Sequence, residues 1–149
     1  MTSDRILKVL VFLLALAGSA LCCAAGFQQT PGGVSYRDLQ VGSGQVVASG
    51  DVVTVHLTGW VQQQGPETQA YISTRKEGYP LQFLVGTARV MPGWNEGVLG
   101  MQAGGRRLLR IPPQLGYGAR AIEHIPADST LVFLVELLAV DTPTQTRGE

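Results

Sequence analysis

Apolar and aromatic side chains, rather than acids, bases or nucleophiles, are the residues of this chain that could form a functional site. Tyr71 and Tyr117 lie in long stretches flanked by glycine, and Trp94 opens a short helical pattern after the turn signal Pro92-Gly93. The full candidate set is Leu57, Tyr71, Leu81, Phe83, Val90, Met91, Trp94, Tyr117 and Phe133. A protein core uses the same residue types, but loop aromatics flanked by glycines more often line a cleft. An apolar cleft with few polar groups suits a ligand such as a proline ring.

Catalysis by a nucleophile or a metal is not predicted. His56 and His124 lie in no recognisable motif, so a Ser–His–Asp triad lacks its base. Two isolated histidines do not make a plausible metal site. The Gly42-Ser43-Gly44 turn precedes no helical pattern, which argues against a phosphate loop. The 11 basic and 11 acidic residues balance and form no basic stripe. We therefore expect no metal, no cofactor and no nucleic-acid partner.

The N-terminal segment has the layout of a secretory signal peptide. Arg5 and Lys8 form a basic region, an apolar run covers residues 9–17, and small residues follow. We expect a signal peptide over residues 1–25, cleaved after Ala24 or Ala25. An uncleaved membrane anchor is the alternative, but the apolar run is short for a span of about 20 residues. The prediction is an exported protein, periplasmic or secreted, with no stable membrane span.

A lipid-anchored form is a less favoured alternative. Both cysteines, Cys22 and Cys23, lie within the expected signal peptide. Leu21 and Cys22 precede them, where a lipidated cysteine usually follows a small residue. Cleavage after Ala25 leaves a mature chain without cysteine, and therefore without a structural disulfide.

Short apolar runs separated by glycines predict a mainly β domain with one short helix. Strands are expected over residues 34–41, 51–61, 81–86, 106–111 and 130–139. The 51–61 run alternates most clearly, with Val53, Val55, Leu57 and Gly59 on one face. The arginines of 106–111 are expected on its exposed side, and the very apolar last strand is expected to be central, with both faces buried.

The remaining segments are expected to connect these elements. Residues 26–33 are predicted to be a linker, 34–140 one domain, and 141–149 a frayed polar tail. Long loops are expected over residues 62–80 and 114–128. Val90 and Met91 are expected to end an extended run immediately before the short helix.

Five motifs in order over most of the chain resemble the FKBP-type peptidyl-prolyl isomerases. They are Val55-His56-Leu57-Thr58-Gly59-Trp60, Pro80-Leu81-Gln82-Phe83, Val90-Met91-Pro92-Gly93-Trp94-Asn95-Glu96-Gly97, Gly116-Tyr117-Gly118-Ala119 and Ile125-Pro126-Ala127-Asp128-Ser129-Thr130-Leu131-Val132-Phe133. The resemblance implies an α+β fold in which an antiparallel β-sheet wraps around one short α-helix. It also implies isomerisation of Xaa–Pro bonds in proline-containing polypeptides.

The resemblance implies roles for individual residues around one apolar pocket. Trp94 would be its floor, the Met91 backbone N–H would bind the peptide, and Tyr117 would offer its hydroxyl. The residues expected to act in catalysis are Tyr71, Val90, Met91, Trp94, Tyr117 and Phe133. Those expected to bind substrate are Leu57, Ile72, Leu81, Phe83 and Ile125, with Ile125 closing the lip of the pocket.

Two positions depart from the family pattern. Leu57 stands where the family usually has Tyr, and Tyr71-Ile72 stands where it usually has Phe-Asp. A hydroxyl and a carboxylate of the pocket rim are therefore missing, so macrolide ligands of the family are expected to bind weakly. The alternatives are a binding module or chaperone of the same fold with little catalysis, and an accessory domain with a residual pocket. A monomer is expected.

Overall fold

This computed structural model describes residues 26–62 and 70–143. The expected signal peptide with both cysteines, and residues 144–149 of the expected tail, lie outside these ranges. Within them, no helix combines the length and the apolar character that a membrane crossing requires.

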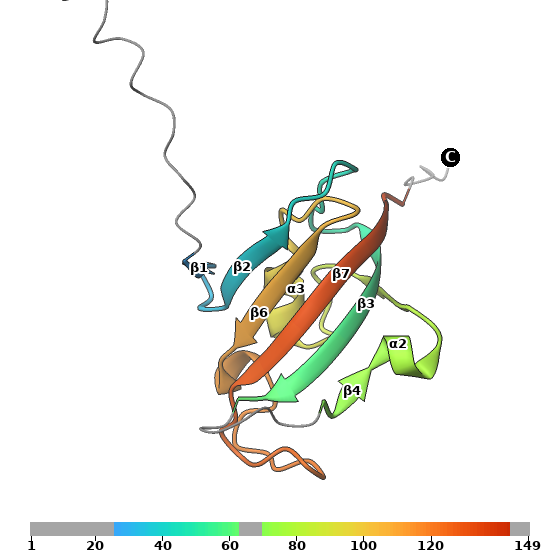
Figure 1. Cartoon of the computed structure of the whole chain (residues 1–149). Helices are drawn as coiled ribbons and strands as arrows, with labels where there is room; N and C mark the ends of the chain where they lie inside the picture. Colours follow the sequence, from blue (N-terminus) through green and yellow to red (C-terminus); the bar gives the residue numbers. More distant parts are fainter. Residues whose placement is uncertain (1–25, 63–69, 144–149) are drawn as a thin grey trace, which may run out of the picture.

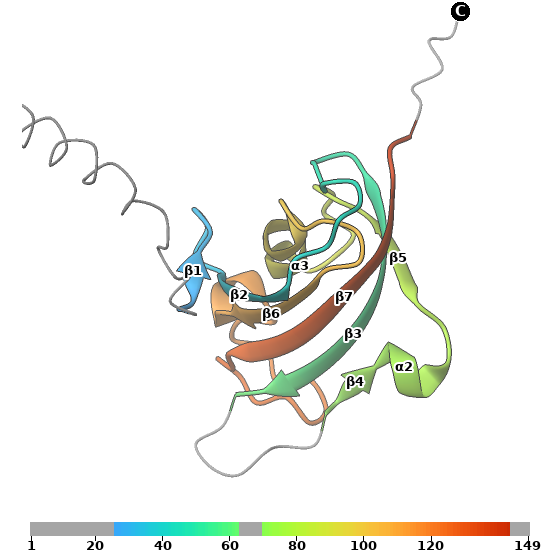
Figure 2. The same ribbon diagram turned by 45° about the horizontal axis from the view of Figure 1, so that its top comes forward.

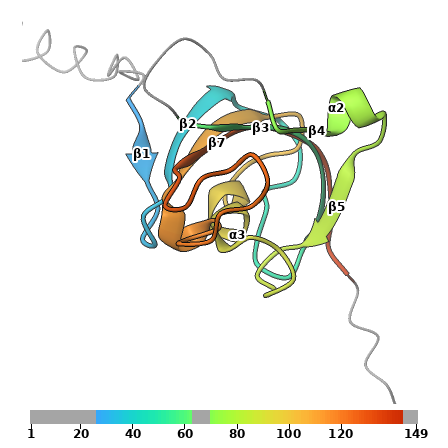
Figure 3. The same cartoon turned by 90° about the horizontal axis from the view of Figure 1, so that it is seen from below.

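One antiparallel sheet forms the body of the protein (Figure 1). Its strand order is β1 (Gln28–Gln29), β2 (Ser35–Gln40), β6 (Arg106–Ile111), β7 (Leu131–Asp141), β3 (Val52–Val61) and β4 (Ile72–Ser73). β5 (Leu81–Leu84) pairs with the other half of β3. The sheet curves around the helix α3 (Pro92–Val98), as Figures 2 and 3 show. The expected fold class, an antiparallel sheet wrapped around one short helix, is confirmed.

The two longest strands lie side by side and supply much of the core. β3 alternates as its sequence predicts, with Val53, Val55 and Leu57 buried on the concave face. β7 is central, between β6 and β3. The expectation that both its faces are buried is wrong: its convex face is partly exposed, and Leu138 is 46% exposed. The reason is that α3 covers only the concave face (Figure 3).

Two glycines let α3 lie directly against β6. A Cβ atom at Gly93 would overlap the Ile111 side chain, and one at Gly97 would overlap Leu109. Glycines four residues apart lie on one face of a helix. The backbone of α3 therefore packs where side chains would otherwise hold the two elements apart.

The N-terminus of α3 is fixed by its own sequence. Pro92 occupies the first turn, where a proline loses no hydrogen bond. The Asn95 side chain accepts a hydrogen bond from the Gly86 N–H (2.9 Å) and donates one to the Thr87 carbonyl (2.7 Å). The expectation that Val90 and Met91 end a strand is wrong, because β5 ends at Leu84. They lie instead in the loop that Asn95 anchors.

Arg107 contradicts the prediction that the arginines of β6 are exposed. Its side chain lies on the concave face and the residue is 5% exposed. It forms an ion pair with Asp38, with Nε to Oδ1 at 2.6 Å, and donates to the Gly97 and Leu99 carbonyls at 3.0 Å. Its guanidinium also stacks on the Tyr36 ring at 4.2 Å. These contacts satisfy a buried charge and cap the C-terminal end of α3.

Both ends of the domain are more ordered than the sequence predicts. The expected linker 26–33 includes β1, and its Thr30 hydroxyl donates a hydrogen bond to Glu96 (2.6 Å). The expected tail begins within β7, which extends to Asp141. The next residue, Thr142, donates a hydrogen bond to Asp51 (2.8 Å). Side-chain hydrogen bonds to distant carboxylates therefore order two segments that were expected to be irregular.

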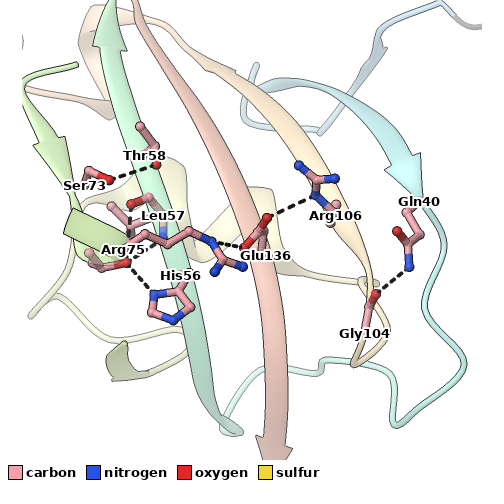
Figure 4. A network of polar contacts seen from close by, with 10 residues as sticks. Gln40, His56, Leu57, Thr58, Ser73, Arg75, Gly104, Arg106 and Glu136 are labelled. Carbon is pink, nitrogen blue, oxygen red and sulfur yellow. Dashed lines mark hydrogen bonds and ion pairs between the residues drawn. The ribbon is translucent and has the colours of Figure 1, made fainter. Parts of the chain in front are cut away.

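The second half of the expected 62–80 loop is also ordered, by polar contacts on the outer side of the sheet (Figure 4). β4 and the single-turn helix α2 (Thr74–Glu77) occupy it. The Thr74 hydroxyl oxygen accepts the Leu57 N–H at 3.0 Å and lies 2.9 Å from His56 Nδ1. Arg75 and Arg106 both form ion pairs with Glu136. These contacts join α2 to β3 and β7.

The expected 114–128 loop begins within the 3₁₀ helix η1 (Pro113–Leu115).

We predict that Asp38→Asn lowers the free energy of unfolding by about 3 kcal/mol, because it leaves the Arg107 charge buried without its counter-ion. This value is at the low end for a buried pair, since the Asp38 side chain is 30% exposed. Urea unfolding followed by circular dichroism measures it. The control is Arg106→Gln, whose ion pair is more exposed and should cost no more than about 1 kcal/mol. Equal losses of unfolding free energy in the two variants would contradict the stabilising role assigned to the Arg107–Asp38 ion pair.

Candidate active site

A pocket of about 350 Å³ opens beside the N-terminal end of α3. Leu81 comes from β5, Val90 and Met91 come from the loop before α3, and Trp94 comes from α3 itself. Gly116 and Tyr117 come from the segment after η1. The complete lining is Leu81, Arg89, Val90, Met91, Trp94, Gly116 and Tyr117. The volume is in the range of small-ligand sites and the lining is mostly apolar, as in such sites.

The floor of the pocket rests on a cluster of aromatic rings. Trp94 meets Phe133 in a T-shaped contact with ring centroids 5.4 Å apart, and Tyr71 meets the same Phe133 ring at 6.1 Å. Phe83 packs against Trp94 at 6.1 Å in a tilted arrangement. Edge-to-face contacts of this kind stabilise aromatic pairs beyond the area they bury. Phe133 is fully buried, so it holds Trp94 from below.

The structure brings five of the expected site residues together around the pocket. Leu81, Val90, Met91, Trp94 and Tyr117 line it. Phe133, Phe83 and Leu57 are instead buried in the core beneath it. Ile125 does not line the pocket either: it is 5% exposed and packs in the core rather than at a lip. The catalytic and binding roles of all these residues stay predictions.

Two lining residues, Arg89 and Gly116, were not among the predicted site residues. Each is the chain neighbour of a predicted one, Val90 or Tyr117. Neither is apolar or aromatic, which was the property that indicated the others. In a lining built from loops, the neighbours of a selected residue are the only local signal for such positions.

Beneath the lining, around Phe133, the chain is apolar at the two positions where a hydroxyl and a carboxylate were expected to be missing. Ile72 pairs with Gly59 in the sheet. A Cβ atom at Gly59 would overlap both the Phe133 ring and the Ile72 side chain. Gly59 thus leaves the space in which these two side chains meet. Because Leu57 is buried on the same face of β3, no carboxylate or hydroxyl is supplied from either position.

The backbone of Met91 presents a hydrogen-bond donor at the pocket. Its carbonyl accepts the Trp94 N–H at 2.9 Å and so begins the first turn of α3. Its own N–H has no acceptor in the described part of the chain. A free N–H beside an apolar surface can bind the carbonyl oxygen of an extended peptide.

The Tyr71 hydroxyl is buried without a hydrogen-bond partner in the described residues, as is the indole nitrogen of Trp94. Burial raises the pKa of the Tyr71 hydroxyl well above its ordinary value, and the nearby Tyr117 raises it further. The ionised form is disfavoured because its charge would lose hydration. Tyr71 therefore remains neutral through the physiological range.

Comparison with known proteins finds relatives of this chain in a single family. The family described as "FKBP-type peptidyl-prolyl cis-trans isomerase" matches residues 42–138. "FK506-binding protein 2" of Yarrowia lipolytica is 36% identical over 138 residues, which cover 92% of this chain and 93% of that protein. "FK506-binding protein" of Neisseria meningitidis serogroup B is 42% identical over 110 residues, covering 73% and 97%.

Solved structures give the same result. The crystal structure of AtFKBP13 has a TM-score of 0.68 and 31% identity to this chain, covering 76% of this chain and 98% of that one. The crystal structure of FkpA from Escherichia coli has the same TM-score and identity and covers 93% of this chain and 60% of that one. Both therefore resemble this chain in sequence as well as in fold.

The raised pKa of Tyr71 predicts a loss of stability at alkaline pH. Below about pH 10, the ordinary tyrosine pKa, Tyr71 is neutral in both states. Above it, the unfolded chain releases this proton while the folded protein keeps it, so stability falls as pH rises toward the folded pKa. Urea unfolding at pH 8, 9, 10 and 11 should show a steeper decline for the unmodified protein than for Tyr71→Phe. A parallel decline of the unfolding free energy in the two proteins would refute the raised pKa of Tyr71.

Proposed function

This chain belongs to the FKBP-type peptidyl-prolyl cis-trans isomerases, and we propose from this premise that its pocket over Trp94 isomerises Xaa–Pro bonds of exported polypeptides and so assists their folding. One observation supports the choice of site above all others. An apolar pocket of about 350 Å³ is lined by Met91, whose N–H has no partner in the part of the chain that the structure describes. A proline ring fits such a surface, and the N–H can fix the peptide that carries the ring.

The reaction requires no covalent step. Rotation about a peptide bond has a barrier of about 18–20 kcal/mol, which comes from amide resonance. The twisted amide has lost this resonance and is less polar than the planar one, so a dry pocket favours it. A thousandfold acceleration requires about 4 kcal/mol of selective stabilisation of the transition state. Burial against Trp94 and one or two hydrogen bonds can supply this amount.

Individual residues divide the work. Trp94 carries the proline ring, and Leu81 and Val90 exclude water around it. The Met91 N–H holds a peptide carbonyl and keeps one side of the bond fixed. The Tyr117 hydroxyl, supplied by the segment after η1, donates to the other side of the substrate. Rotation then occurs between two held ends, which is how orientation contributes to catalysis.

Export is the part of the proposal that rests on sequence alone. It is supported by the basic residues Arg5 and Lys8 and by the apolar run over residues 9–17. The mass of the protein recovered from the periplasm or medium would test it. A chain that retains residues 1–25 in the cytoplasm would contradict it. We also propose that the protein is a monomer, which light scattering during size-exclusion chromatography measures.

A second candidate function, holding unfolded chains with little catalysis, is favoured by the apolar residues Leu57 and Ile72, which pack beneath the pocket and supply no polar group to it. A site of this kind binds apolar segments without the polar groups that would orient them. The two candidate functions differ in whether a bound peptide also exchanges faster between its cis and trans forms. Measuring peptide binding and exchange together therefore separates them.

Macrolide ligands offer a test of the pocket wall. We expect weak binding of FK506, because Ile72 and Leu57 provide no polar group where the family usually has one. Titration calorimetry measures the affinity, and Ile72→Asp should tighten it by restoring a carboxylate. Tight binding by the unmodified protein would contradict this prediction.

The central prediction concerns Trp94. Trp94→Ala should lower the catalysed exchange of Xaa–Pro peptides about a hundredfold, equal to about 2.7 kcal/mol of transition-state stabilisation. NMR exchange spectroscopy on short peptides measures cis and trans populations and their rates directly.

The matched control is Trp60→Ala, which removes the second tryptophan of the chain. Trp60 lies on the convex face of β3 and does not line the pocket. This variant should retain its catalysis, and circular dichroism should show that both variants fold. Unchanged exchange in Trp94→Ala would rule out this site. Peptide binding without faster exchange in the unmodified protein would favour the binding module instead.

A further inference from the structure

One residue of the pocket lining carries a charge, Arg89. The other members of the lining are apolar side chains, a glycine and a tyrosine. Arg89 is exposed and lies two residues before Met91, whose N–H has no partner within the described residues. It belongs to the loop between β5 and α3 that Asn95 fixes (Figure 3). Arg89 therefore lies at the edge of the site in which the proline would lie.

Within the described residues, this positive charge is not neutralised by an ion pair. The ion pairs found there join Arg75 and Arg106 to Glu136 and Arg107 to Asp38. The pocket lining itself contains no acidic residue. A cation at the mouth of an apolar pocket, without a partner of opposite charge, attracts anionic groups of a ligand.

The loop between η1 and β7 does not supply a negative charge to the lining. It crosses in front of α3 in Figure 3 and carries Arg120, Glu123 and Asp128. All three are exposed, and none of them lines the pocket. Their opposite charges also partly cancel one another.

We propose that Arg89 is a specificity-determining residue, which makes this isomerase prefer proline bonds with an acidic residue immediately before the proline. The inference rests on the proposed site at Trp94. A side chain next to the proline must leave the pocket across its edge, where Arg89 lies. A glutamate there would form an exposed ion pair with the guanidinium group, and a lysine would be repelled.

The size of the preference follows from the exposure of Arg89. Exposed ion pairs contribute little, so the expected change in kcat/KM between a Glu-Pro and a Gln-Pro peptide is about two- to fivefold at low salt. A charge at the edge of a site acts mainly on association, so the difference should be found in KM rather than kcat. It should vanish at 1 M salt, where charges are screened beyond about 3 Å.

Three peptides that differ only in the residue before proline, Glu, Gln or Lys, test the proposal by NMR exchange and by binding affinity. The unmodified protein should rank them Glu, Gln, Lys. Arg89→Gln should bring the three together, and Arg89→Glu should reverse the order. Lys76→Gln is the matched control: it removes one positive charge from α2, outside the pocket lining, and should preserve the ranking.

The outcomes separate this inference from the proposed function. Equal rates and affinities for the three peptides overturn the role of Arg89 while leaving the isomerase site in place. A ranking that persists in Arg89→Gln also overturns it. If no peptide is accelerated, the proposed function fails, and the ranking of affinities still decides the inference.

Discussion

The close packing of α3 on β6 is the constraint on which the rest of the structure depends. The sheet can wrap around this helix only because Gly93 and Gly97 have no side chains at the contact. The helix is short, with few backbone hydrogen bonds of its own, so its stability comes from tertiary packing. The close approach of α3 to β6 also sets how deeply the Trp94 side chain lies beneath the pocket, because Trp94 follows Gly93 in the same helix. A larger residue at either glycine would move the helix and the pocket floor together.

Arg107 holds the other end of this arrangement. A buried arginine is costly unless its charge and its donors are satisfied. Here one carboxylate, two carbonyls at the end of α3 and the Tyr36 ring satisfy it. The hydrogen bonds of Arg107 thus fix where α3 ends, while Gly93 and Gly97 fix how near it lies to β6. Packing alone would not specify the end of the helix.

The pocket combines a rigid floor with a mostly apolar lining. Phe133 and Phe83 immobilise Trp94 through ring contacts, and Asn95 holds the loop that carries Met91 and Arg89. Leu57 and Ile72 pack beneath this lining, and as apolar side chains they add no polar group to the core around Phe133. Arg89 forms no ion pair within the described residues. The two departures from the family pattern therefore bear on catalysis, and the charge of Arg89 bears on substrate choice.

The sequence by itself determined the five longer strands and the helix α3, because alternation and helical spacing are local patterns, and its apolar and aromatic residues indicated much of the pocket lining. The short elements β1, β4 and α2 form in segments without such a pattern. The sequence could not predict that the Arg107 side chain is buried in an ion pair. Alternation shows that Arg107 shares a face with Leu109 and Ile111, but its partner Asp38 is 69 residues away in the sequence. Nor could it separate Leu57, Phe83 and Ile125, which are buried, from Leu81 and Tyr117, which line the pocket. Both groups consist of apolar or aromatic residues. Only the curvature of the sheet around α3 and the pairing of distant strands decide which of them reach the surface, because burial depends on contacts between segments that no local pattern contains.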